Sequence, residues 1–259
     1  MGINQGPISL DQKYTQPSGH VFLTGIQALV RLPMMQRQRD LAAGLNTAGF
    51  VTGYRGSPLG NVDQEVWKAK KYLEPMQIRF QAGLNEDLAA TSVWGTQQVN
   101  LDPNAKYDGV FSIWYGKGPG VDRSGDALRH ANQAGTAPWG GVLAVAGDDH
   151  GAKSSTMAAQ TDFVFAAVSI PVLAPATVQD YLDLGLHGFA MSRFSGLWVA
   201  MKAVTDTIET AGIVDVSPER VQPRLPADFP MPPGGLNLRW PEEPFVKMEE
   251  RLMRHKLPA

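Results

Sequence analysis

The sequence contains no cysteine, and this absence removes several classes of chemistry. Without thiols the chain forms no disulfide, holds no zinc ion or iron–sulfur cluster through cysteine, and performs no thiolate catalysis. A chain without disulfides fits a reducing compartment. We therefore expect a cytoplasmic location.

An excess of one charge and long apolar runs are also missing. The chain has 23 Lys and Arg against 25 Asp and Glu, a net charge of −2, so it has no basic character to attract nucleic acid. No apolar run approaches the ~18 residues that span a bilayer. The first residues lack a basic segment followed by an apolar one, so we expect neither a signal peptide nor a membrane partner.

Several common site motifs are absent as well. No GxGxxG follows a predicted strand, and no Gly-Lys-Ser/Thr ends a phosphate-binding loop. The HExxH and GxSxG motifs are missing too. The sequence thus gives no basis for a dinucleotide-binding, P-loop, zinc-protease or α/β-hydrolase site.

Short apolar segments recur along the chain, with helical patterns between them. Such segments indicate a parallel sheet that is covered by helices on both faces. With 259 residues, 43% of them hydrophobic, the chain can build a large core. We predict a doubly wound α/β fold with a mainly parallel sheet of about six strands. The strands are expected at 50–54, 76–82, 109–115, 140–147, 170–176 and 196–202.

The flanking regions predict a division into three parts. Residues 1–24 are polar and suggest an extended arm, and 25–216 carry the alternating pattern of the domain. Nine of the 19 prolines lie in 217–259, which predicts a linker and the start of a following region. Within the domain, we expect a helix to begin at Pro33, since proline suits a first helical turn. Another helix is expected over 154–169.

Four polar, glycine-containing segments follow predicted strands: GYRGSPLGN, QAGLNED, YGKGPGVDRSGD and GDDHGAKSS. Ligands of parallel sheets bind beyond the carboxyl ends of the strands. We therefore expect all four segments at one edge of the sheet.

Acidic residues in these segments allow two interpretations each. Asp148, Asp149 and His150 suit either a metal site or a polar turn, and their single segment favours the turn because metal ligands usually converge from several segments. Glu86 follows Asn85 at a predicted helix start. First-turn acids favour the helix dipole by ~0.3–1 kcal/mol, so spacing alone favours this structural role.

The order of the four motifs resembles the N-terminal domain of 2-oxoacid:ferredoxin oxidoreductases, most closely the indolepyruvate branch. The resemblance extends over about residues 20–216. It implies the pyrimidine-binding half of a thiamine diphosphate enzyme. By this resemblance Glu86 becomes the catalytic and cofactor-binding carboxylate, which hydrogen-bonds N1′ of the aminopyrimidine and sets its tautomer.

The same resemblance assigns a substrate-binding role to the GYRGSPLG loop. Arg55 stands where the family often has proline, and it either binds a substrate carboxylate or faces solvent. Lys117 matches a family lysine only in part, and it is expected near the same carboxylate. No metal ligand is expected. The substrate-binding residues implied are Tyr54, Arg55, Gly56, Ser57, Pro58 and Lys117, and Ser57 is also expected near the cofactor.

The implied activity is oxidative decarboxylation of an aryl or branched 2-oxoacid to acyl-CoA, with electrons passed to ferredoxin. Mg²⁺, the cofactor diphosphate and 4Fe-4S clusters would be bound by regions outside this chain. Its partners would be a diphosphate-binding domain or subunit, coenzyme A and ferredoxin, in a homodimeric enzyme. Two alternatives remain open: a non-catalytic interaction or scaffold domain, and a subunit of a non-oxidative thiamine-dependent decarboxylase.

Overall fold

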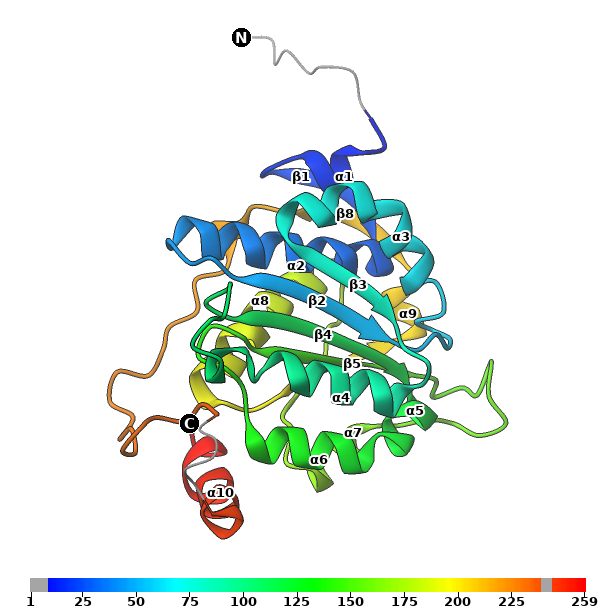
Figure 1. Cartoon of the computed structure of the whole chain (residues 1–259). Coiled ribbons are helices and arrows are strands. Elements are labelled where there is room, and N and C mark those ends of the chain that lie inside the picture. The colour runs from blue at the N-terminus through cyan, green and yellow to red at the C-terminus, as the bar shows by residue number, and fades with distance from the viewer. Residues whose placement is uncertain (1–8, 239–243) are drawn as a thin grey trace.

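The computed structural model describes residues 9–238 and 244–259. Its body is a six-stranded sheet between two layers of helices (Figure 1). The strand order is β3-β2-β4-β5-β7-β6, and all neighbouring strands are parallel, which confirms the predicted fold class. The elements are α1 (Gln12–Thr15), β1 (His20–Thr24), α2 (Gly25–Ala42), β2 (Ala48–Gly53), α3 (Val62–Leu73), β3 (Ile78–Ala82), α4 (Glu86–Thr96), β4 (Val110–Lys117), α5 (Gly118–Arg123), α6 (Gly125–Ala134), β5 (Val142–Asp148), α7 (Asp162–Ala167), β6 (Val172–Leu173), α8 (Val178–Ser195), β7 (Val199–Val204), α9 (Thr205–Ile208), β8 (Ala211–Asp215) and α10 (Phe245–Arg251), with 3-10 turns at Glu74–Met76, Val99–Leu101 and Pro218–Arg220 and a π-helical turn at Leu252–Lys256.

Alternate side chains of the central strands enter two separate cores. Ile113 and Tyr115 of β4 pack with side chains of α2, α3 and α8, whereas Trp114 between them packs with side chains of α4 and α6. On β5, Leu143 likewise packs in the first core and Ala144 in the second. Successive strand residues point to opposite faces, and here both faces are covered. This double burial explains the nearly continuous apolar segments of the sequence.

Helix α2 is unbroken, with Pro33 inside it, so the predicted helix start at Pro33 was wrong. The helix begins earlier because Thr24 and Gln27 form a reciprocal capping box. An internal proline costs about 3 kcal/mol. Burial of the Leu29 and Leu32 side chains on this helix stabilises the fold by about 1.5–3 kcal/mol each, which offsets that cost. Among the described residues, neither α2 nor any other helix has the length and apolar character needed to cross a membrane.

The N-terminal segment is folded where it is described, so the predicted extended arm is wrong for residues 9–24. Strand β1 pairs antiparallel with β8, beside the main sheet. The inner side chains Leu23 and Val214 of this ribbon are buried in the core. The Tyr14 hydroxyl of α1 donates a hydrogen bond of 2.8 Å to Glu65 on α3. Residues 1–8 lie outside the described residues.

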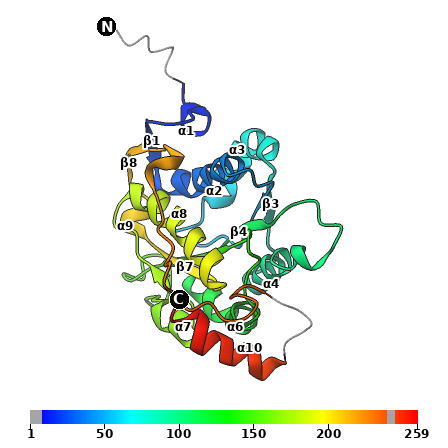
Figure 2. The same cartoon turned by 90° about the vertical axis from the view of Figure 1, so that its left-hand side faces the viewer.

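The C-terminal segment packs against the domain, so its described part is not a free linker. Leu236 and Leu238 are buried, and Leu238 packs with Ala134 of α6 and Met248 of α10. Figure 2 shows this segment crossing the side of the molecule on which α8 ends. Apolar residues between the prolines cause this packing. Residues 239–243 lie outside the described residues.

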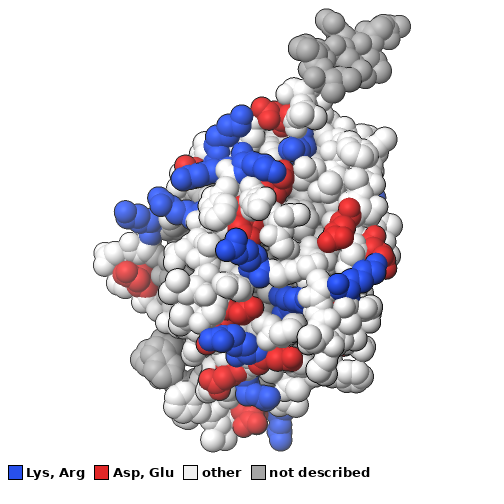
Figure 3. All heavy atoms as spheres, turned by 90° about the vertical axis from the view of Figure 1, so that its right-hand side faces the viewer, with Lys and Arg blue, Asp and Glu red and all other residues white. Residues whose placement is uncertain are grey.

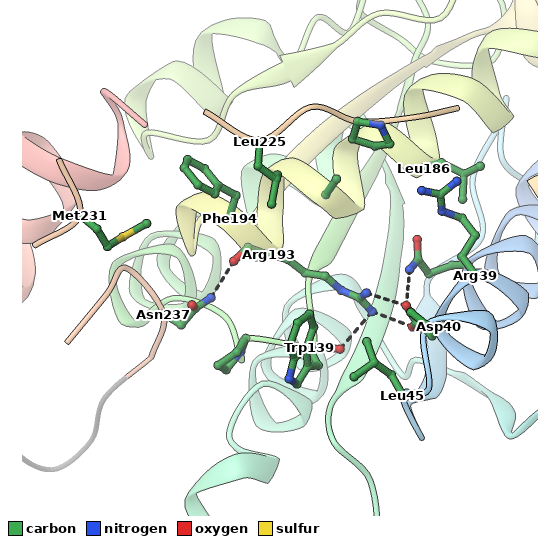
Figure 4. Close-up of a pocket in the computed structure, with 15 residues that line it drawn as sticks. Arg39, Asp40, Leu45, Trp139, Leu186, Arg193, Phe194, Leu225, Met231 and Asn237 are labelled. Carbon is green, nitrogen blue, oxygen red and sulfur yellow. Dashed lines mark hydrogen bonds and ion pairs between the residues drawn. The ribbon is translucent and has the colours of Figure 1, made fainter. Parts of the chain in front are cut away.

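A buried ion pair joins α2 to α8 at the amino edge of the sheet. Both guanidinium Nη atoms of Arg193 bind the Asp40 carboxylate, at 2.7 and 2.8 Å (Figure 4). Gln36 and Thr47 donate further hydrogen bonds to the same carboxylate. Arg193 also donates to the carbonyl of Trp139 at 3.0 Å. The pair therefore ties three segments that are far apart in the sequence.

We expect Arg193→Ala to lower the free energy of unfolding by about 3–5 kcal/mol, because it leaves the Asp40 carboxylate buried without its cation. Urea denaturation measures this change. The control is Arg129→Ala, which removes an exposed guanidinium from α6 and should change stability little. Equal effects of the two substitutions would contradict the role given to the pair.

Candidate functional site

The candidate site lies where the strand order of the sheet reverses. From β2 the chain crosses to β3 on one side and then returns to β4 on the other. Such a switch point leaves an opening beyond the carboxyl ends of the strands, where ligands of this sheet type bind. The four predicted segments follow β2, β3, β4 and β5, whose parallel pairing puts them at one edge. Figure 3 shows this face, on which acidic and basic side chains are interspersed.

Glu86 opens helix α4 at this edge. The Asn85 side chain caps the helix by accepting a hydrogen bond of 2.9 Å from the Leu88 backbone N–H. The indole N–H of Trp114 donates to the Glu86 carbonyl at 2.9 Å. These contacts fix the backbone of Glu86 relative to β4, and its side chain is half-buried.

The side chain of Glu86 lies against two glycines that follow the apolar part of β4. A Cβ atom on Gly120 would lie 2.4 Å from Cγ and 2.5 Å from Oε1 of Glu86, and one on Gly116 would lie 3.3 Å from Cγ. Only glycine at position 120 leaves room for the carboxylate. Asp87 points elsewhere, toward Arg123 at 2.9 Å, and this hydrogen bond lowers the pKa of Asp87.

The GYRGSPLG loop follows β2 and packs against the ends of β4 and β5. A Cβ on Gly56 would lie 2.9 Å from Cβ of Lys117, so the two segments touch. Tyr54 and Arg55 are exposed, and Ser57 is half-buried. Pro58 is buried, 3.0 Å from the position that a Cβ on Gly147 would take. This contact anchors Pro58 in the fold, and its expected role in substrate binding stays a prediction.

Lys117 is held by the loop after β5. Its ammonium donates to the Ser154 carbonyl at 3.1 Å and hydroxyl at 3.0 Å, and lies 3.9 Å from Asp149. The loop is thus a partner of Lys117, and its expected place near the substrate carboxylate stays a prediction.

Asp148 and Asp149 organise the loop over 149–161, which explains why only residues 162–167 of the helix expected at 154–169 are helical. Asp149 accepts hydrogen bonds from the backbone N–H of Ser154 and of Lys153, which lower its pKa. Asp148 accepts from the N–H and hydroxyl of Thr161, while burial raises its pKa. These contacts support the polar-turn interpretation. Within residues 9–238 and 244–259 no three His, Cys, Asp or Glu side chains are grouped to hold a metal.

A larger hollow lies at the opposite edge of the sheet, and its charged groups are arranged differently. It measures about 460 Å³ and lies between the ends of α2 and α8 and the C-terminal segment (Figure 4). Asp40 and Arg193 bind each other there, and Arg39 donates to the carbonyls of Pro218 and Val221 at 2.6 Å. Its charged groups therefore serve the fold. A smaller hollow of about 130 Å³ adjoins Tyr54 and Arg55 at the carboxyl edge.

The contact of Glu86 with Gly116 and Gly120 is the feature that sequence reasoning missed. From the sequence, the YGKGPGVDRSGD segment is expected only to lie at the same edge of the sheet as Glu86. The sequence feature that could have indicated this contact is the repetition of glycine directly after a predicted strand. Glycine leaves room there for a side chain from another segment.

The chain is similar in sequence to two indolepyruvate oxidoreductase subunits. No family model matches the chain. Over 203 residues, 78% of the chain, it is 23% identical to the indolepyruvate oxidoreductase subunit IorA of Methanothermobacter marburgensis and 24% identical to that of Methanothermobacter thermautotrophicus. The matched region is 29% of each of those proteins, so the chain spans less than a third of their length.

A solved structure has the same fold. The 2-oxoglutarate:ferredoxin oxidoreductase from Magnetococcus marinus, with 2-oxoglutarate, coenzyme A and succinyl-CoA bound, superposes with a TM-score of 0.63 at 14% identity. The superposition covers 94% of this chain and 45% of that one. These similarities confirm the resemblance of the four motifs: the chain resembles the 2-oxoacid:ferredoxin oxidoreductases in fold and is 23–24% identical to indolepyruvate oxidoreductase subunits.

Proposed function

We propose that this chain is the pyrimidine-binding part of an indolepyruvate-type 2-oxoacid:ferredoxin oxidoreductase. The full enzyme would convert an aryl or branched 2-oxoacid to acyl-CoA by oxidative decarboxylation and pass the electrons to ferredoxin. The observation that carries the proposal is the Glu86 carboxylate, which lies against the bare backbone of Gly120 at the switch point of the sheet.

The residues at this edge fit one half of thiamine diphosphate. The cofactor, when bound, supplies a thiazolium carbon that adds to the keto carbon of a 2-oxoacid. Glu86 would hydrogen-bond N1′ of the aminopyrimidine, and the Ser57 hydroxyl would lie near the same ring. The diphosphate, its Mg²⁺ and the 4Fe-4S clusters would be held by other regions of the enzyme, in keeping with a chain that has no cysteine.

Glu86 would act by holding a proton at N1′ and thereby setting the tautomer of the ring. A carboxylate suits this task because it accepts a hydrogen bond when ionised and donates one when protonated. Exclusion of water strengthens the contact. The capped start of α4 and the two glycines beside the side chain keep the carboxylate in one place, which is the requirement for a positioned acid–base group.

The carboxyl edge also carries the surface that a partner domain would cover. Leu84 after β3 is 86% exposed, and Trp67, Leu88 and Tyr54 of the neighbouring segments are 40–54% exposed. Exposed apolar side chains grouped at a site mark an interaction surface. We propose that the diphosphate-binding domain or subunit packs here, in a homodimeric enzyme, and that it completes the cofactor site.

We expect Glu86→Gln in the assembled enzyme to slow exchange of the thiazolium proton by about 10²–10⁴-fold, the usual contribution of a general acid or base. Glutamine keeps the shape of the side chain but loses the ionisable group. Proton exchange is followed by NMR in deuterated buffer. The control is Asp87→Asn, which removes the neighbouring charge and its exposed pairing with Arg123 and should leave the exchange rate nearly unchanged.

If both substitutions slow the exchange equally, or if Glu86→Gln lowers only thermal stability, Glu86 is a helix-start charge. The result would favour the alternative of a domain that keeps this fold for interaction alone.

We expect Gly120→Ala to slow the same exchange by about 10²-fold, because the added methyl takes the place of the Glu86 carboxylate and misplaces it. Gly125→Ala is the matched control, since a Cβ at that position meets nothing within 4 Å. Circular dichroism checks that both variants fold. Normal exchange in folded Gly120→Ala would refute the positioning of Glu86 described above.

We expect the chain alone to bind thiamine diphosphate and Mg²⁺ more weakly than about 1 μM, a free energy less favourable than about −8 kcal/mol. It supplies only the aminopyrimidine side of the site. Isothermal titration calorimetry measures the affinity. Tighter binding by the chain alone would show that it also holds the diphosphate, contrary to the proposal.

A further inference from the structure

Strand β3 is the outermost strand on one side of the sheet, and its outer side is open. Among the described residues only β2 pairs with it (Figure 1). On the other side of the sheet the outermost strand β6 has only two residues, whereas β3 has five. Native proteins usually shorten or cover such outer strands, because an exposed one is a template for pairing with another chain. The longer strand β3 is therefore the place where a further strand can add to this sheet.

The pairing with β2 shows which backbone groups of β3 are free. Hydrogen bonds of 3.0 Å at the Gln77 carbonyl and 2.9 Å at the Gly83 N–H join the two ends of this strand to β2. Backbone groups of a parallel strand turn alternately to its two sides, so the even-numbered residues of β3 turn theirs away from β2. Ile78 is buried, but Phe80 is half-buried and Ala82 is exposed. The N–H and C=O groups of Phe80 and Ala82 thus have no strand to pair with among the described residues.

A groove of about 250 Å³ lies between this strand and helix α3. Val66, Leu73 and Ile78 line it and are buried apolar side chains. Trp67 lines it as well and is 54% exposed, and its ring meets that of Phe80 edge-on, with the centroids 5.6 Å apart and the planes at 79°. An extended segment that pairs with an outer strand directs alternate side chains to one face, where a groove can receive them. The groove is thus suited to an apolar side chain of such a segment.

The charged side chains of the groove favour an acidic occupant. Lys70 pairs with Glu74 at 3.5 Å, and because both side chains are exposed this pair is weak. Arg79 also lines the groove and is exposed. Within the described part of the chain its guanidinium has no hydrogen bond or ion pair. An arginine without a partner presents its N–H groups to a carboxylate in a bidentate geometry.

We propose that β3 and this groove bind an extended, acidic protein segment. The segment adds a strand beside Phe80 and Ala82, places an apolar side chain in the groove beside Trp67, and presents a carboxylate to Arg79. This inference goes beyond the proposed function and does not depend on Glu86 or on thiamine diphosphate.

Two other interpretations of the open strand account for less. Charged residues protect outer strands from unwanted pairing, and this role explains Arg79 but neither the apolar groove nor the exposed Trp67. A second copy of this chain could pair through its own β3. Such pairing would bring two Arg79 side chains onto one short ribbon, where like charges are unfavourable.

The first test is the selection of peptides from a random library displayed on phage, with the whole chain as the target. We expect the enriched peptides to alternate acidic and apolar residues. Arg79→Glu should remove the enrichment of acidic residues, because it replaces the cation by an anion. Arg129→Glu makes the same exchange at an exposed position of α6 and should leave the enrichment unchanged. A selection without acidic peptides, or one that Arg79→Glu leaves unchanged, would overturn the proposal.

The second test measures the affinity of an enriched peptide, made synthetically, for two variants of one residue. Ala82→Pro removes an N–H from the outer side of β3, and proline is tolerated where the N–H of an outer strand faces solvent. It should weaken binding about two- to tenfold, the usual effect of one hydrogen bond. Ala82→Val keeps the N–H and should bind the peptide as the unmodified chain does. Equal affinities of the two variants would show that no strand is added.

Hydrogen exchange of the unmodified chain gives the same answer if Ala82→Pro does not fold, which circular dichroism shows. The peptide should slow exchange of the Phe80 and Ala82 amides, and unslowed exchange there would overturn the proposal. The Arg79 and Gln81 amides are the internal control, because they face β2 and should exchange slowly with or without peptide. Sedimentation tests the second copy as occupant, and self-association that Ala82→Pro weakens would also overturn the proposal.

Discussion

The reversal of strand order between β2 and β4 is the constraint on which the candidate site depends. Connections leave this point in opposite directions, so the edge of the sheet is open there. Glu86 comes to the opening from the helix after β3, and Tyr54 comes to it directly after β2. Gly53 allows β2 and β4 to approach closely, since a Cβ there would lie 2.1 Å from the Tyr115 carbonyl oxygen. In a sheet whose strand order does not reverse, the segments that carry Tyr54 and Glu86 would not meet at one opening.

The two edges of the sheet use their charged groups in opposite ways. At the amino edge Asp40 and Arg193 satisfy each other and bind helices together. At the carboxyl edge the Glu86 carboxylate lies against the backbone of Gly120, and Leu84 is left almost fully exposed. The first arrangement stabilises the chain by itself. The second favours binding, because exposed apolar groups are stabilised when a partner covers them.

Local patterns predicted the parts of this structure that local physics determines. The apolar strands, the Asn85 cap and the start of α4 at Glu86 follow from burial on both faces and from capping chemistry. The contact between Glu86 and Gly120 joins residues from different elements, which no periodicity reveals. Similarly, only the tertiary structure brings the ammonium of Lys117 into contact with Ser154. The predicted helix start at Pro33 was wrong because tertiary packing outweighs the local preference of proline.

We propose that the Glu86 carboxylate and the switch point form the aminopyrimidine half of a thiamine diphosphate site. A crystal structure of the assembled enzyme with the cofactor bound tests it most directly, through the distance from the Glu86 carboxylate oxygens to N1′. We expect a hydrogen bond of about 2.6–3.0 Å, with Gly120 against the glutamate side chain. A cofactor ring that lies elsewhere, or one whose N1′ is bound by a different acidic residue, would contradict it.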